Sequence, residues 1–310
     1  MNDIHEIKEI WQGEIGRALK GGRVVVLLIL FLLFIGLALT IVGSINYGLN
    51  GKIDEALQQG QVDKAAAAAQ AIESRKKVLS TFFTDDESLL EFLATMPLVL
   101  FVVFKLTMMF GPLFIALMGF DQISGEIGPK SIRYLVVRVK RSSILLGKFA
   151  AQATLASGLL ILCTIVMVVV AKVLNDDFAV GAAVLMGFKL SAVLVVFALA
   201  YLALSSLCSS VTRQSGVSLV LNVILLFVVW AMALIGNLVR LPGEEAAFGT
   251  LASLKPEHWV GYMRFGSVWN FGQDLLHPEP ARFLSAGMVH LGFALFFLGL
   301  AHLALRKRDL

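Results

Sequence analysis

Six long apolar stretches separate the polar parts of the chain, and they limit the folds open to it. Each stretch can cross a hydrocarbon core of ~30 Å as a helix that rises about 1.5 Å per residue. Charged residues make up only 15% of the 310 residues, whereas soluble domains usually carry about 25%. We therefore expect an all-α integral membrane protein whose six transmembrane helices lie at about residues 24–45, 97–120, 145–173, 180–207, 216–239 and 283–305.

Residues 1–22 are predicted to form an amphipathic helix, followed by a single transmembrane domain at 23–310. Isoleucine, tryptophan and leucine recur at helical spacing between Ile4 and Leu19. The several acidic residues of this segment are untypical of a signal peptide. We expect the helix to lie in the cytoplasmic interface of the membrane, with Trp11 among the headgroups. The alternative is a solvated helix that packs on a partner.

Two further segments are predicted to lie on the outer side of the membrane. Residues 46–95 are polar, and an alanine-rich run that begins at Lys64 has strong helix propensity, so we expect an extracytoplasmic helical insert that folds as a hairpin. Residues 240–282 are only half polar, and aromatic side chains recur from Trp259 to Phe271. This pattern predicts interfacial or re-entrant helices that dip into the membrane before the last span.

Basic residues gather in the segments that alternate with these outer ones. They are dense between the second and third apolar stretches, and three of them, Arg306, Lys307 and Arg308, follow the sixth stretch directly. By the positive-inside rule these segments face the cytoplasm. Both termini are therefore expected on the cytoplasmic side.

The sequence carries no motif of a catalytic, nucleotide-binding or metal site. Cys163 and Cys208 lie in apolar runs and are expected as buried thiols. The histidines are scattered and form no His-Glu-x-x-His zinc motif, and the glycines and lysine of 125–131 have the wrong spacing for a phosphate-binding Walker A loop. We expect no enzyme activity, cofactor or metal in this chain, and the net charge of +4 does not suggest nucleic acid.

A polar segment that we call the polar island runs from Asp121 to Lys148, between the second and third apolar stretches. Its glycines and Pro129 interrupt a regular helix, and residues 132–139 can then form a short surface helix. The island is too long for a tight turn, so we expect a cytoplasmic partner to contact it. Its acids are Asp121 and Glu126, and its bases are Lys130, Arg133, Arg138, Lys140, Arg141 and Lys148.

Three short motifs in the polar island resemble a known family. Ser124–Glu126, Ile132–Leu135 and Leu145–Lys148 look like the cytoplasmic loop of ABC-2 type transporter permeases. Lys130–Ser131 stands where this family usually has Gly-Thr, and the proline that usually precedes the arginine is absent. Outside the island the resemblance is one of architecture, which includes the interfacial N-terminal helix and the membrane-dipping segment.

The resemblance implies a permease subunit of an ATP-binding cassette transporter in a bacterial inner or plasma membrane, more often an exporter than an importer. It also implies a second permease subunit, identical or different, surrounding membrane lipids, and a separate ATPase subunit that binds ATP and Mg²⁺. Residues 121–144 would be the coupling loop. The residues expected to couple to the ATPase are Asp121, Ser124, Gly125, Glu126, Arg133, Arg138, Arg141 and Lys148.

Two other classes of function stay open at this point. One is a membrane scaffold or assembly protein without transport, which would use the 46–95 insert to hold an outer partner. The other is a secondary transporter or channel that works without ATP. A neighbouring ATPase reading frame would favour the ABC transporter over both.

Three charged residues allow two interpretations each. Lys105 and Lys189 lie inside apolar stretches, where a lysine costs about 2.5–3.5 kcal/mol on insertion scales. They either extend their ammonium groups to the outer interface or face a polar substrate pathway. Glu126 either caps a helix start, which is worth about 0.3–1 kcal/mol, or pairs with a basic group of the ATPase or of the neighbouring span.

Overall fold

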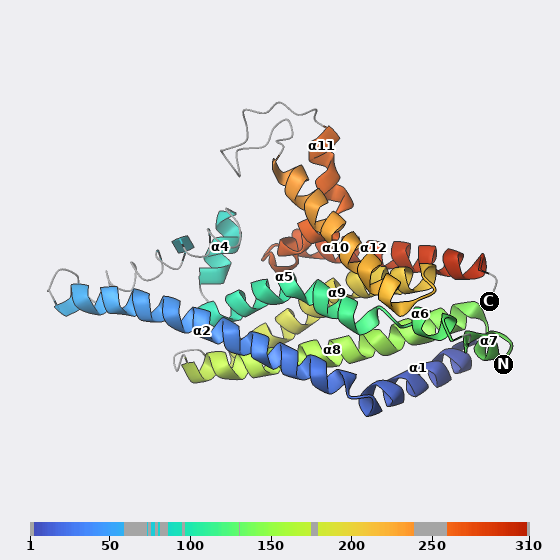
Figure 1. The fold of residues 1–310 in the computed structure, drawn as a ribbon. Coiled ribbons are helices and arrows are strands. Elements are labelled where there is room, and N and C mark those ends of the chain that lie inside the picture. Colours follow the sequence, from blue (N-terminus) through green and yellow to red (C-terminus); the bar gives the residue numbers. More distant parts are fainter. Residues whose placement is uncertain are drawn as a thin grey trace.

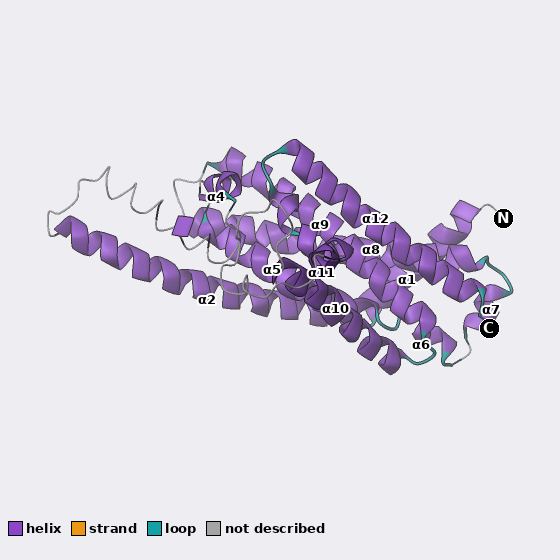
Figure 2. Ribbon diagram, turned by 90° about the horizontal axis from the view of Figure 1, so that it is seen from above, coloured by secondary structure: helices purple, strands orange, loops and turns teal. Residues whose placement is uncertain are grey.

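The computed structural model describes residues 3–58, 73, 76–77, 80, 86–94, 97–129, 131–174, 179–238 and 259–308. Within these residues every regular element is a helix, and none is a strand (Figure 2). Three short 3₁₀ helices, η1 to η3, lie between Met263 and Leu276. The α-helices are α1 Asp3–Lys20, α2 Arg23–Gln58, α4 Glu87–Ala94, α5 Leu98–Gly119, α6 Ser124–Ile127, α7 Ile132–Val136, α8 Arg141–Leu174, α9 Val180–Val211, α10 Ser215–Leu238, α11 Trp259–Tyr262 and α12 Pro280–Arg306.

Six of the described helices are long and apolar enough to cross a membrane. They are α2, α5, α8, α9, α10 and α12, which follow the chain in the same order as the six apolar stretches. The prediction of an all-α membrane protein with six spans is thereby confirmed. The N and C termini lie at the same end of the bundle (Figures 1 and 2), as an even number of spans requires.

Helix α2 continues beyond its apolar stretch as far as Gln58, into the segment predicted as an outer insert. No proline interrupts the polar residues that follow Ile45, so the helical hydrogen bonds can continue. The predicted hairpin of this insert, including its alanine-rich run, lies mostly outside the described residues. Of the second outer segment, residues 259–276 are described as α11 and the 3₁₀ helices, and residues 239–258 are not.

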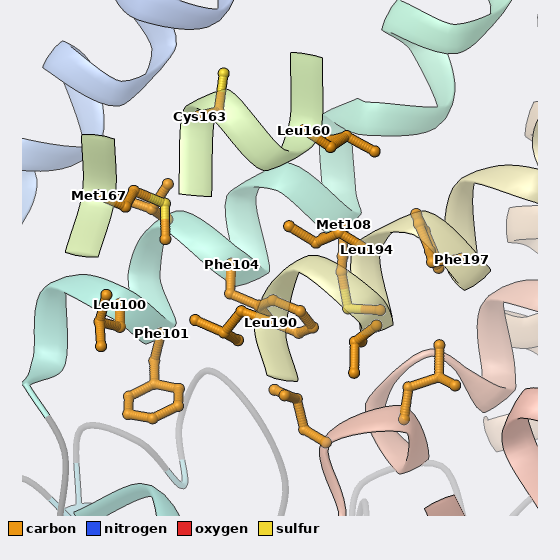
Figure 3. Packing of buried hydrophobic residues seen from close by; sticks show 14 of the residues in the cluster. Leu100, Phe101, Phe104, Met108, Leu160, Cys163, Met167, Leu190, Leu194 and Phe197 are labelled. Atoms are coloured by element: carbon orange, nitrogen blue, oxygen red, sulfur yellow. The ribbon is translucent and has the colours of Figure 1, made fainter. Parts of the chain in front are cut away.

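Helix α9 forms the centre of the bundle and packs against α5, α8, α10 and α12. Phe101 and Phe104 of α5, Met167 of α8 and Leu190 of α9 belong to one buried apolar cluster, and Figure 3 shows Phe104 lying beside Leu190. The outer helices instead leave large apolar side chains exposed, for example Leu33 on α2. A soluble protein rarely leaves so much apolar surface uncovered. The lipid chains of a bilayer would cover it.

Buried hydroxyl groups near the end of α9 hold the turn between α5 and α6. The Ser209 hydroxyl oxygen accepts hydrogen bonds from the backbone N–H groups of Ile123 (2.8 Å) and Ser124 (3.0 Å). Gly119 at the end of α5 lies so close to α9 that a Cβ atom there would come within 2.6 Å of the Ser205 hydroxyl oxygen. Since buried N–H groups need partners, the serines of α9 fix where the polar island leaves the bundle.

Helix α1 packs along the first half of α8 (Figure 1). Ile10 approaches Gly147 so closely that a Cβ atom on this glycine would lie 2.8 Å from the Ile10 Cβ atom. The Trp11 indole N–H donates to the Thr154 hydroxyl group over 3.0 Å. Part of the apolar face predicted for residues 1–22 therefore packs against α8, the third span of the same chain. That α1 also lies in the membrane interface stays a prediction.

Candidate functional site

Four charged side chains from three helices form what we call the ion cluster: Glu14 and Arg17 of α1, Glu126 of α6 and Lys148 of α8. The Lys148 ammonium group donates to Glu14 Oε1 over 2.6 Å and to Glu126 Oε1 over 2.8 Å. Arg17 Nη1 donates to Glu126 Oε1 over 3.0 Å and to Glu14 Oε1 over 3.2 Å. Each carboxylate is thus shared by two cations, and the cluster as a whole is neutral.

Burial makes Lys148 the central member of the ion cluster. Its side chain is 2% exposed, against 14% for Glu126 and 23% for Glu14. A buried ammonium group is stable only when carboxylates surround it, because the desolvation of a lone ion costs several kcal/mol. Arg17 is 68% exposed, so its ion pairs add little. Its pKa is raised, first by the hydrogen bond with Glu126 and then by the charge of Glu14.

The ion cluster borders a cleft of about 410 Å³ between α1, α2, α5, α6 and α8. Asp121, Gln122 and Gly125 line this cleft beside the cluster, and so does Gln152 of α8. The predicted residues Asp121, Gly125, Glu126 and Lys148 therefore meet at one cleft between helices of this chain. They do not form an outward surface.

Ser124, the first residue of the Ser124–Glu126 motif, has a positioning role. It is 1% exposed, and its hydroxyl group donates to the Phe120 carbonyl oxygen over 3.0 Å. Its backbone N–H is held by Ser209 of α9. With Ser124 fixed in this way, α6 begins at a defined place and carries Glu126 toward Lys148.

The outward surface of the polar island is formed by α7 and the residues after it. Ile132 is buried against Ile123 and Leu145 and anchors α7 to the end of the bundle. Tyr134 and Val137 are 82% and 87% exposed, although neither lies in one of the six candidate spans. Arg138 is also exposed, whereas the side chain of Arg133 lies outside the described residues. An exposed pair of large apolar groups beside basic residues is typical of a protein contact.

Arg141 is directed toward the end of α12. Its guanidinium group donates to the carbonyl oxygens of Leu305 (2.8 Å), Arg306 (2.9 Å) and Arg308 (2.9 Å). The last carbonyl groups of a helix have no partner within that helix, so Arg141 caps α12 and ties it to the start of α8. This contact accounts for Arg141 structurally, and its predicted role toward the ATPase stays a prediction.

The two lysines predicted in a substrate pathway lie away from the cleft beside the ion cluster. Lys189 Nζ is 3.5 Å from the Leu276 carbonyl oxygen and 4.3 Å from the ring centre of Phe92 on α4. This position matches an ammonium group that extends toward the outer end of its helix. Lys105 of α5 is half-buried. Neither lysine is among the described residues that line the cleft, and their role in transport stays a prediction.

Sequence reasoning included Lys148 of α8 but missed Glu14 and Arg17 of α1 and the two glutamines of the cleft, Gln122 and Gln152. Glu14 and Arg17 are one helical turn apart and so share one face of α1, which is a signal that the sequence did contain. Nothing in the sequence indicated that this face meets Glu126, since the contact joins residues more than a hundred positions apart. No sequence pattern indicated Gln122 or Gln152, which stand out only as polar residues beside or within apolar stretches.

Comparison with known proteins supports the resemblance noted in the sequence. A family model described as ABC-2 family transporter protein matches residues 9–310, which is nearly the whole chain. A search of curated proteins found no match. The matched range includes all six candidate spans, the polar island, most of α1 and all four residues of the ion cluster. The chain belongs to the ABC-2 family of transporter proteins.

Proposed function

We propose that this chain is the permease subunit of an ATP-driven exporter and that the polar island couples it to a separate ATPase subunit. The ABC-2 family as a whole works with ATP-binding subunits. The end of the bundle with α7 and both termini faces the cytoplasm, where the ATPase binds. A second permease subunit, identical or different, completes the pathway, and the bilayer is that of a bacterial inner or plasma membrane.

The observation that carries this proposal is the way the polar island divides into two faces. One face, with Tyr134 and Val137, is exposed and apolar and is suited to contact a partner. The other face, with Glu126, is tied by the ion cluster to α8 and α1. A displacement of α7 by the ATPase would therefore be passed through α6 to the third span.

Replacement of Val137 by aspartate tests the contact with the ATPase. Burial of a valine side chain is worth about 1.5 kcal/mol or more, so Val137→Asp should reduce the amount of ATPase subunit that copurifies with the chain about tenfold or more. Val180→Asp is the matched control, because Val180 is 65% exposed at the start of α9, far along the chain from the island. Equal copurification with both variants would contradict the proposed contact.

A further inference from the structure

We propose that the ends of α9 and α12 bind the headgroup of an anionic phospholipid through four basic residues that we call the basic patch: Arg213, Arg306, Lys307 and Arg308. The patch lies at the end of the bundle that carries both termini (Figure 1). Arg213 follows the last residue of α9 by two positions, and the other three begin with the last residue of α12. The proposal concerns this chain and the surrounding lipid alone, so it does not depend on the coupling to an ATPase.

Arg308 joins the end of α12 to the end of α9. Its guanidinium group donates to the carbonyl oxygens of Ser210 (2.6 Å), Val211 (3.0 Å) and Thr212 (2.9 Å). The pKa of Arg308 is lowered, first by its partial burial and then by the positive charge of Arg213. The fold therefore holds two positive charges close enough to repel each other, which favours an anion beside them.

No carboxylate among the described residues neutralises the basic patch. None of its four side chains forms an ion pair there, and the partners of Arg308 are carbonyl oxygens without a net charge. Other basic residues at this end of the bundle are paired, since Lys148 contacts two glutamates and Lys140 contacts Asp3. Asp309 follows the patch in the sequence, and its single charge cannot balance four. The patch thus keeps an excess of positive charge.

The position of the basic patch favours a lipid as the source of the anion. The candidate spans of α9 and α12 end at Val211 and Arg306, so the patch lies within two residues of the span ends, where headgroups are expected. Large apolar side chains stand beside it, since Val211, Val217 and Leu303 are 51%, 53% and 50% exposed. A lipid meets both needs, because its chains cover the apolar groups while its phosphate accepts charge-assisted hydrogen bonds from arginine. Basic clusters directly after a transmembrane helix are typical of binding to anionic lipids.

Competition between two lipids tests the proposal. The full-length chain is purified in detergent with equal amounts of phosphatidylglycerol and phosphatidylcholine that have the same acyl chains, and native mass spectrometry measures the bound lipid. Phosphatidylglycerol should be retained about tenfold more, because phosphatidylcholine has no net charge. Arg213→Gln combined with Lys307→Gln should lower this preference about tenfold. Both side chains are exposed and form no hydrogen bond within the described residues, so the fold should persist.

Lys8→Gln combined with Lys20→Gln is the matched control. It removes the same charge from exposed positions of α1, and it should leave the preference for phosphatidylglycerol unchanged.

Three results would overturn the proposal. Equal retention of the two lipids by the wild-type chain would show that the charge of the headgroup is not recognised. An equal loss of preference in both double variants would show that any basic residue at this end attracts the lipid. An unchanged preference in the variant of Arg213 and Lys307 would show that the lipid lies elsewhere, and a loss of a copurifying protein from that variant would then assign the patch to a protein partner.

Discussion

Lys148→Met is expected to lower the free energy of unfolding by about 3–5 kcal/mol, because it leaves two partly buried carboxylates without their central cation. Lys148 is 2% exposed and contacts both Glu14 and Glu126 at hydrogen-bond distance. Removal of one carboxylate at the same time should restore part of the loss, so Lys148→Met combined with Glu126→Gln should be more stable than Lys148→Met alone. Thermal unfolding of the purified variants in detergent measures both effects.

An exposed ion pair between the first residue of α1 and the residue before α8 provides the control for this experiment. Lys140 pairs with Asp3 at 2.6 Å, but the two side chains are 63% and 56% exposed. Because exposed pairs contribute about 0–1 kcal/mol, Asp3→Asn should leave the unfolding temperature almost unchanged. If Lys148→Met also unfolds at the wild-type temperature, the ion cluster does not stabilise the fold.

Glu126→Gln is expected to preserve folding and assembly but to uncouple the ATPase from the permease. The amide keeps one hydrogen-bond acceptor for Lys148 but loses the negative charge that holds α6 to α8 and α1. In the purified complex we expect the effect of the permease on the rate of ATP hydrolysis to fall about tenfold, which corresponds to ~1.4 kcal/mol of coupling. The rate with and without the permease subunit measures this effect.

The same measurement separates the two roles considered for Glu126. As a helix cap alone, Glu126 would be worth about 0.3–1 kcal/mol of stability and nothing to the ATPase. If the Glu126→Gln permease changes the rate of ATP hydrolysis as much as the wild-type permease does, the role of Glu126 is purely structural. Asp3→Asn again serves as the control, and it should keep wild-type coupling.

The six spans could be predicted from the sequence because the bilayer imposes their length and composition directly. The polar island could be located for the same reason, since charged residues such as Asp121 and Glu126 are costly in hydrocarbon. The end of α2 was harder to predict, because its polar continuation to Gln58 has no apolar signal. In this polar part of α2 the bilayer no longer dictates the composition, and the helix continues on the helix propensity of its residues.

The arrangement of the site could be predicted only in part. The Ser124–Glu126 motif drew attention to the segment that carries Glu126, but the partners of Glu126 depend on which face of α1 packs on α8. That choice rests on a close contact between Ile10 and Gly147, which no local pattern encodes. Likewise, Arg141 was expected to face a partner subunit, and only the fold shows that it lies beside the last carbonyl groups of α12.

Photo-crosslinking from the outward face of the polar island tests the central claim most directly. A photoreactive amino acid placed at Val137 in native membranes should form an adduct with a protein that contains an ATP-binding cassette, because Val137 is 87% exposed beside α7. The same group placed at Val180, at the start of α9, should not form this adduct. An ATP-binding subunit captured from Val180, or only proteins without an ATP-binding cassette captured from Val137, would contradict coupling through the polar island.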